Sequence, residues 1–367
     1  MNNTIPHFPP GKAALFNGQG RPFEHISRSL PMLRAGEILV KTRYTTICGS
    51  DIHTYNGRRL EPPQVVLGHE IVGDILWIDQ AHRKRDLRGN PLECGDRITW
   101  SIFAVPQGVT APREDMPQKS ERLFKYGHHL AEGDDVFNGG FAEYCILRAN
   151  TAIIKIPSSI PAKVAATINC AHATVAGALR VAGNIANLNV LVFGAGLLGL
   201  SCVAMCREAK ASTIGLIDVD HHRLQWGEQF GADSTYEFPS ESTETDPMPW
   251  PDADIVFDMT GNPKAMKAGI ESLALGGCAV WIGAVFPSEG VPVDAQRMVR
   301  KILTIRGLHN YNYEDFLEAT LFIEDHYQKY PFEKLVEKEF VMEDIDNAFA
   351  YASKERPVRV GIRFDGE

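Results

Sequence analysis

The stretch NVLVFGAGLLGL, residues 189–200, constrains the fold of this chain more than any other feature. An apolar run ends at a turn in which Gly194, Gly196 and Gly199 fit the pattern G-x-G-x-x-G, with Leu197 and Leu198 at the two variable positions before the last glycine. An apolar, helix-like segment follows at once. A buried strand that enters a tight glycine turn and continues as a helix is typical of a β-α-β unit in a parallel sheet.

This turn predicts a dinucleotide site. Glycines let the backbone approach a pyrophosphate, and the N-terminus of the following helix faces its charge. Asp218 ends the next apolar run, close to the spacing of about 20 residues that is expected for an acid that binds the ribose. A carboxylate there repels a 2′-phosphate and favours NAD over NADP, although the nearby Arg223 could pair with a phosphate.

The same alternation continues along the second half of the chain. We expect further strands at 212–218, 253–261, 276–284 and 301–308, and a helix at 222–232 that ends in glycine. The acidic, proline-rich stretch 239–254 is interpreted as a surface loop. Beyond residue 308 we expect amphipathic helices at 314–328 and 344–354 and a closing strand at 357–364.

The first half has a different pattern. Short β-like runs at 37–46, 65–78, 96–104 and 142–157 are separated by Gly, Pro and Asn, which predicts an irregular antiparallel β domain. Two polar insertions interrupt it at roughly 80–95 and 105–138. A chain of 367 residues is long enough for two such domains.

Charge and cysteine content exclude some classes of protein. The net charge is −9, and no block of basic residues is long enough to offset it, so a nucleic-acid binder is disfavoured. The seven scattered cysteines and the lack of a secretory signal favour a reducing, cytoplasmic setting. The apolar stretch 190–206 is nearly long enough to span a membrane, but its glycines and the following Arg207 and Glu208 favour a buried strand and helix.

Three residues stand out as candidate metal ligands. Cys48 lies in TTICGSDIHTYNGRR, His69 in GHE and Cys170 in TINCAHATVAG. Two thiolates and an imidazole leave one position open on a zinc ion, as a catalytic site requires. The spacing by itself leaves two interpretations open, a zinc site and a set of buried free cysteines.

The motifs CGSDIH, GHEIVG, GDRI, the lone Cys170 and VLVFGAGLLGL together resemble the zinc-dependent medium-chain alcohol dehydrogenases. The resemblance implies an α/β protein in which a GroES-like β catalytic domain is joined to a doubly wound, parallel-sheet Rossmann domain. The implied domains are 1–170 for the catalytic part, 171–308 for the NAD-binding part and 309–367 for a return to the catalytic domain. It also implies a homodimer or homotetramer.

The resemblance further implies roles for individual residues. Cys48, His69 and Cys170 would bind zinc, with Glu70 able to approach the metal and Asp51 orienting the ligand histidine. Ser50 would take the proton of the substrate hydroxyl and His53 would pass it to solvent. The remaining implied residues are cofactor contacts, namely Thr174 to the nicotinamide and Arg359 to the pyrophosphate.

One departure from the family concerns a second, structural zinc. Many members hold it on four closely spaced cysteines, but residues 105–138 contain no cysteine, and Ser120 stands where the last of the four would fall. Hydroxyl and amide side chains cannot form a closed thiolate site. We therefore expect one catalytic zinc per subunit and no structural zinc.

The substrate is addressed by a narrower resemblance. NGRR and LFKYGH are similar to segments of putative alcohol dehydrogenases associated with phosphonate catabolism. Guanidinium groups suit phosphonates and other oxyanions, so Arg58, Arg59 and Lys125 are candidate substrate contacts, with His128 as a further source of charge. The alternative is that these are solvated surface residues.

Three functions follow from these patterns. The first is an NAD-dependent zinc alcohol dehydrogenase that acts on a small anionic alcohol or its carbonyl form. The second is a polyol or amino-alcohol dehydrogenase of the same fold, in which the arginines have no part. The third is a zinc-free protein similar to quinone reductases, or a cofactor-binding protein without catalysis, and the presence of Cys48, His69 and Cys170 disfavours both.

Overall fold

The computed structural model describes residues 8–238 and 252–364, and the chain forms two compact units. The first unit contains the residues up to Cys170, Asn312–Tyr327 and the residues from Phe332 onward. The second contains Ala171–Tyr311 and Gln328–Pro331. Most of the surface loop expected at 239–254 lies outside the described residues.

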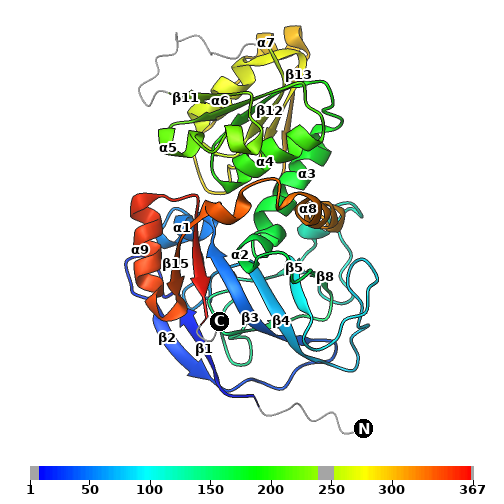
Figure 1. Cartoon of the computed structure of the whole chain (residues 1–367), viewed down its shortest axis with the longest axis vertical. Coiled ribbons are helices and arrows are strands. Elements are labelled where there is room, and N and C mark those ends of the chain that lie inside the picture. The colour runs from blue at the N-terminus through cyan, green and yellow to red at the C-terminus, as the bar shows by residue number, and fades with distance from the viewer. Residues whose placement is uncertain (1–7, 239–251, 365–367) are drawn as a thin grey trace. The chain divides into compact units, whose positions relative to one another are not determined.

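The first unit is built on an eight-stranded sheet of the described residues. Its strands follow the order β15-β16-β3-β4-β5-β6, with β7 on β3 and β8 on β5 (Figure 1). All pairs are antiparallel except β15–β16, and β1 and β2 form a separate antiparallel pair. The strands are β1 (Gly11–Leu15), β2 (Glu24–Arg28), β3 (Ile38–Ile47), β4 (Glu70–Ile78), β5 (Arg97–Ala104), β6 (Phe124–Lys125), β7 (Tyr144–Leu147), β8 (Thr151–Lys155), β15 (Val336–Val341) and β16 (Arg359–Arg363).

The end of the chain returns to this sheet. Strand β16 pairs with β3 so that Val360 lies opposite Ile47, which brings the last strand beside the residues that follow β3. The helices of the unit are α1 (Gly49–Tyr55), η1 (Pro117–Lys119), α2 (Ala162–Ala165), α8 (Tyr313–His326), η4 (Phe332–Leu335), η5 (Met342–Asp344) and α9 (Ile345–Glu355). A π-helical turn, η2 (Ile168–His172), follows α2 at the point where the first unit ends.

The second unit is a doubly wound α/β domain. Its described strands form one six-stranded, all-parallel sheet in the order β11-β10-β9-β12-β13-β14, which is the Rossmann arrangement. The strands are β9 (Asn189–Phe193), β10 (Thr213–Asp218), β11 (Ser234–Glu237), β12 (Ala253–Asp258), β13 (Leu273–Trp281) and β14 (Thr304–Gly307). The helices are α3 (Ala173–Ala182), α4 (Leu197–Glu208), α5 (His221–Leu224), η3 (Glu228–Phe230), α6 (Pro263–Glu271) and α7 (Ala295–Lys301). The fold class expected from the sequence is confirmed.

The predicted helix at 222–232 is wrong. The segment forms the short α5, a turn and the short η3 instead. The backbone N–H groups of Trp226, Gly227 and Gly231 bond to carbonyls three residues earlier, so the segment tightens into turns instead of continuing as an α-helix. Gly231 then closes η3 in the left-handed region at φ 97°.

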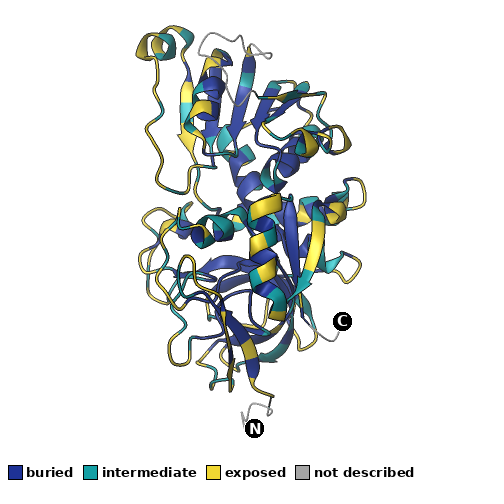
Figure 2. Ribbon diagram, turned by 90° about the vertical axis from the view of Figure 1, so that its left-hand side faces the viewer, coloured by how far each residue is buried: buried dark blue, intermediate teal, exposed yellow. Residues whose placement is uncertain are grey.

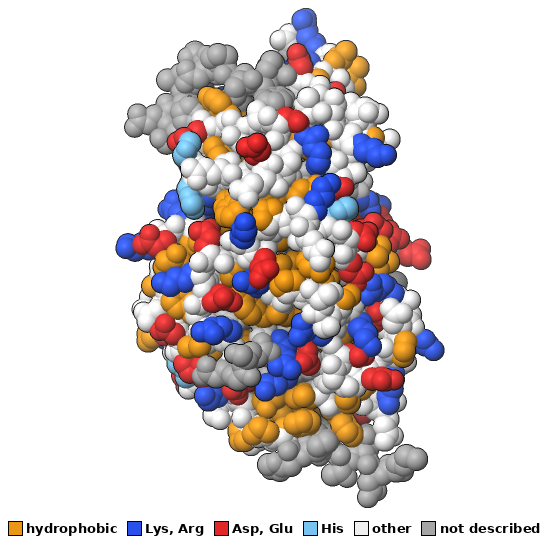
Figure 3. Space-filling view, in the orientation of Figure 1, with side chains coloured by type: hydrophobic (Ala, Val, Ile, Leu, Met, Phe, Trp, Pro, Cys, Tyr) orange, Lys and Arg blue, Asp and Glu red, His pale blue; other side chains and the backbone are white. Residues whose placement is uncertain are grey.

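The strands of both sheets are mostly buried (Figure 2). Strand β9 and helix α4 are almost entirely enclosed, which explains why the stretch 190–206 is so apolar. No helix of the described residues is long and apolar enough to cross a membrane. On the face in Figure 3, acidic and basic side chains are interspersed rather than gathered into a field of one sign.

The cysteine-free insertion at 105–138 is held to the first unit by aromatic packing and hydrogen bonds. The rings of Phe124 and Tyr126 meet edge to face, and the guanidinium of Arg148 lies 4.3 Å from the centre of the Phe124 ring. The buried Tyr126 hydroxyl lies 2.6 Å from the Thr151 hydroxyl and accepts a hydrogen bond from the backbone N–H of Arg148. Ser120 donates to the carbonyl of Pro117 and so closes η1.

The contact between α4 and the glycine turn predicts the effect of two substitutions. A Cβ on Gly199 would lie 1.6 Å from the carbonyl oxygen of Gly194, whereas a Cβ on Gly196 would meet nothing within 4 Å. We expect Gly199→Ala to lower the free energy of unfolding by about 1–3 kcal/mol or more, because the helix must move away from the strand. Gly196→Ala is the matched control and should leave it nearly unchanged. Urea unfolding of both variants tests this, and equal stabilities would contradict it.

Candidate metal and cofactor site

The first candidate ligand, Cys48, lies at the point where β3 ends and α1 begins. Its carbonyl accepts hydrogen bonds from the backbone N–H groups of Asp51 and Ile52, which starts the helix. The Asp51 carboxylate accepts in turn from the backbone N–H of Cys48 at 2.9 Å. This reciprocal pair fixes the position of the Cys48 sulfur.

The second candidate, His69, immediately precedes β4. Its Nδ1 lies 3.5 Å from the other oxygen of Asp51, and its Nε2 lies 3.4 Å from the Ser50 hydroxyl. Both His69 and Asp51 are buried. Asp51 therefore lies at the Nδ1 side of the imidazole and Ser50 at its Nε2 side, and their implied roles stay predictions.

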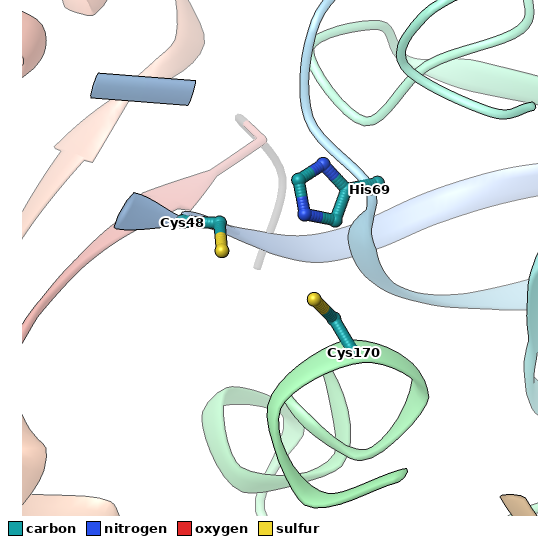
Figure 4. A group of neighbouring side chains, drawn as sticks. All are labelled: Cys48, His69 and Cys170. Carbon is teal, nitrogen blue, oxygen red and sulfur yellow. The ribbon is translucent and has the colours of Figure 1, made fainter. Parts of the chain in front are cut away.

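The third candidate, Cys170, lies in the π-helical turn η2. The donor atoms of Cys48, His69 and Cys170 all lie within 4.8 Å of one another, and Figure 4 shows the three side chains pointing toward a common centre. Two sulfurs and one imidazole nitrogen, largely buried, fit a tetrahedral zinc ion with one open position. Among the described residues, these three side chains form the one cluster of three or more His, Cys, Asp or Glu that could hold a metal ion.

The electrostatics of this group favour a bound cation. Hydrogen bonding from the Cys170 thiol, together with the charge of Arg359 and contact with His69, holds the pKa of Cys48 well below its ordinary value. Burial lowers the pKa of His69, but Asp51 and Cys48 outweigh burial and raise it well above its ordinary value. A thiolate is the form of cysteine that binds metal.

Glu70 and Arg359 form a buried ion pair beside the candidate ligands. The guanidinium of Arg359 donates to both carboxylate oxygens at 3.0 Å, and the Thr46 hydroxyl donates to one of them. The Nη2 of Arg359 also lies 3.8 Å from the Cys48 sulfur. Burial raises the pKa of Glu70 to about 7, although Arg359 opposes this shift. The pyrophosphate contact implied for Arg359 stays a prediction.

The two residues of the implied proton relay differ in their surroundings. Ser50 contacts the ligand ring, whereas His53 is half-buried one turn further along α1. Burial and the charges of Arg58 and Arg59 lower the pKa of His53. The backbone N–H groups of both arginines donate to the His53 carbonyl, which keeps the two residues close to the relay.

The nucleotide turn in the second unit joins β9 to α4. Gly194 adopts φ 102°, and the Asp218 carboxylate accepts from the backbone N–H of Ala195 at 2.5 Å. The first residue of α4, Leu197, is buried, and Leu198 is partly exposed. Asp218 is thus tied to the glycine turn at the carboxyl end of β10.

Two further expected cofactor contacts also lie in the second unit. Arg223, in α5, lies 3.8 Å from the Asp220 carboxylate, and Thr174 is buried in α3.

Arg58 and Arg59, the two arginines of NGRR, have different surroundings. Arg58 is exposed and lies beside His53, whereas the partly buried Arg59 lies 3.0 Å from the Glu61 carboxylate. The same oxygen of Glu61 lies 2.9 Å from Nδ1 of His128, and the His128 ring packs 5.3 Å from the His69 ring. Lys125 is partly buried, and burial together with Arg59 and Lys119 lowers its pKa. Arg59, Glu61, Lys125 and His128 are called the charged wall below.

Sequence reasoning missed Glu61. It lies outside every quoted motif, and its role depends on a contact across 67 residues of sequence to His128. A Cβ on Gly127 would lie 2.6 Å from the Gly68 carbonyl, so only glycine allows the KYGH segment to approach His69 so closely. That glycine was the one available signal.

Comparisons with known proteins agree with this geometry. Residues 34–158 match the alcohol dehydrogenase GroES-like domain and residues 198–325 match the zinc-binding dehydrogenase domain. The chain belongs to the zinc-dependent medium-chain alcohol dehydrogenases. As a member of this family it is an oxidoreductase.

Individual relatives extend over most of the chain. The L-threonine 3-dehydrogenase of Pectobacterium atrosepticum is 28% identical over 300 residues, which is 79% of this chain and 78% of that protein. An alcohol dehydrogenase from Thermotoga maritima superposes with a TM-score of 0.89 at 24% identity, over 98% of this chain and all of that chain. A protein from Sinorhizobium meliloti that is described as a zinc-binding dehydrogenase, in complex with NADP, superposes with a TM-score of 0.84 at 21% identity, over 97% of this chain and all of that chain. At these identities, the matches to solved structures show that the fold is shared.

The metal content of this dehydrogenase can be predicted from its ligands. We expect a single zinc ion per chain, because the insertion at 105–138 contains no thiol that could hold a structural ion. Cys170→Ser should release most of that zinc. Metal analysis of the purified protein by mass spectrometry measures both values, and two ions per chain would contradict the expectation.

Proposed function

We propose that this protein is an NAD-dependent zinc alcohol dehydrogenase that interconverts a small, anionic alcohol and its aldehyde or ketone. The observation that carries the proposal is the convergence of Cys48, His69 and Cys170 with the Ser50 hydroxyl directly beside the His69 ring. The proposal places the enzyme in the cytoplasm, as its scattered cysteines favour, and makes it a homodimer or homotetramer, as the family resemblance implies.

The residues divide the work of hydride transfer. Zinc, when bound, supplies a Lewis acid that polarises the substrate oxygen. Ser50 accepts the hydroxyl proton and His53, which is half-buried, passes it to solvent. Asp51 keeps the His69 imidazole in one orientation, and the Glu70–Arg359 pair neutralises charge at the back of the ligand set. Thr174 would contact the nicotinamide ring of a bound cofactor, which would supply the hydride acceptor.

The charged wall supports an anionic substrate. Lys125 interacts electrostatically with Arg59 and with the nearby Lys119, and the Glu61 carboxylate interacts with both Arg59 and Lys125. Cations outnumber anions in this group, and its His128 packs against the ring of His69. An oxyanion such as a phosphonate, sulfonate or carboxylate on the substrate would balance that excess.

A second candidate is an amino-alcohol or polyol dehydrogenase. The relative from Pectobacterium atrosepticum carries the name L-threonine 3-dehydrogenase, and the Glu61 carboxylate could accept an ammonium group. This candidate is less favoured because Glu61 already contacts Arg59 and His128. A zinc-free protein similar to quinone reductases is disfavoured by the three converging ligands.

The anionic substrate leads to a test of two side chains. Arg59→Ala and Lys125→Ala should each raise KM for a hydroxyalkyl phosphonate about tenfold or more, because each removes a charge-assisted hydrogen bond of about 1.5–3 kcal/mol. kcat should change little.

Steady-state NADH formation measures both constants, with a neutral diol as the control substrate. Arg113→Ala, which removes an exposed arginine paired with Asp115, is the control variant. If both variants keep the wild-type KM for every anionic alcohol, the anion site is refuted and the amino-alcohol or polyol dehydrogenase is favoured.

The proton relay predicts the pH dependence. His53 must be neutral to accept a proton, and its pKa is lowered, so kcat/KM for alcohol oxidation should hold to a lower pH than an ordinary histidine permits. Arg58→Ala removes a repelling charge, raises the pKa of His53 and should move the acid limb of the profile to higher pH. A pH series of kcat/KM for both proteins measures this. An acid limb that stays in place would show that His53 does not govern it.

The preference for NAD rests on Asp218. Asp218→Asn keeps an oxygen that can accept from Ala195 but removes the charge that repels a 2′-phosphate. We expect the ratio of kcat/KM for NADP to that for NAD to rise by about tenfold, the equivalent of about 1.4 kcal/mol. Glu228→Gln removes an exposed charge of the same unit and is the control. An equal effect of both substitutions would indicate general charge rather than ribose binding.

A further inference from the structure

A buried amide connects two of the candidate metal ligands. Asn169 is fully buried and lies in the turn η2 immediately before Cys170. Its side-chain Nδ2 donates to the carbonyl oxygen of His69 at 2.9 Å and to the carbonyl oxygen of Trp100 at 2.8 Å. One side chain therefore joins the turn that carries Cys170 to the backbone of His69 and to strand β5.

Both hydrogens of this amide are used. A primary amide has two N–H donors, and each points to a carbonyl on a different segment of the first unit. Serine has one donor and an ionised aspartate has none. Loss of a donor would remove a hydrogen bond from a buried carbonyl that water cannot readily replace.

The local backbone makes such a connection valuable. Cys170 lies in a π-helical turn, which is a rare form that occurs mostly as single turns at functional sites. His69 lies just before β4, outside the ladder of that strand. Neither ligand is therefore positioned by a regular element, and the amide of Asn169 supplies a direct link between them.

We propose that Asn169 is a positioning residue of the metal centre, which holds Cys170 and His69 at binding distance before the ion arrives. Residues that orient metal ligands typically contribute about 10- to 100-fold to metal affinity. The inference rests on the proposed assignment of Cys48, His69 and Cys170 as the zinc ligands.

The test compares two buried asparagines. Asn169→Asp and Asn169→Ser are made beside Asn138→Asp, because Asn138 is also buried and its amide also donates to backbone carbonyls, those of His129, Leu130 and Asp135. Zinc affinity is measured by competition with a chromophoric chelator, the absorption spectrum of the cobalt-substituted protein is recorded, and thermal unfolding of the metal-free protein is followed.

We expect Asn169→Asp to weaken zinc binding by about 10- to 100-fold and to alter the cobalt spectrum, with a smaller loss for Asn169→Ser. Asn138→Asp should lower the unfolding temperature without changing zinc affinity. Wild-type zinc affinity in both Asn169 variants would overturn the proposal, as would equal losses of affinity in the Asn169 and Asn138 variants.

Cys170→Ser separates this inference from the ligand assignment. If Cys170→Ser loses zinc and the Asn169 variants keep it, the ligands are correct and the role of Asn169 is wrong. If Cys170→Ser keeps full zinc affinity, the ligand assignment fails and the proposal for Asn169 fails with it.

Discussion

The candidate site depends on one buried carboxylate, that of Asp51. A charge that is taken out of water is tolerated only if it is paired and hydrogen-bonded, and Asp51 meets this condition by holding the backbone N–H of Cys48 and the ring of His69 at once. The start of α1 and the orientation of the imidazole are thereby set by the same group. Loss of the His69 ring would leave the Asp51 carboxylate buried without its paired side chain.

A second buried pair extends this network to the end of the chain. Arg359 comes from the last strand, yet it binds Glu70 through both oxygens and reaches the Cys48 sulfur, because β16 pairs with β3. The C-terminal return is therefore part of the site itself. A fully buried ion pair of this kind adds little to stability on its own, but it fixes which strands must meet.

Much of the fold and part of the site could be predicted from sequence patterns. Strand β9, the glycine turn and α4 were predictable because a buried parallel strand, three glycines and an apolar helix are local signals. The segment 222–232 was not, because the change from α-helical to tighter i→i−3 hydrogen bonds leaves no mark in the apolar pattern. Glu61 was missed because its partner His128 lies far away in the sequence.

Local sequence patterns specify the fold class of each domain, the order of the motifs and the chemical types of the three candidate ligands, since each depends on residues that are close together along the chain. Packing of the segments selects which of the neighbouring Arg58 and Arg59 joins the charged wall, and it lets Asn169 link Cys170 to His69. These outcomes depend on contacts between distant segments. Hydrophobic patterns specify which faces are buried, but the partner of a buried polar group is fixed only when the segments pack together.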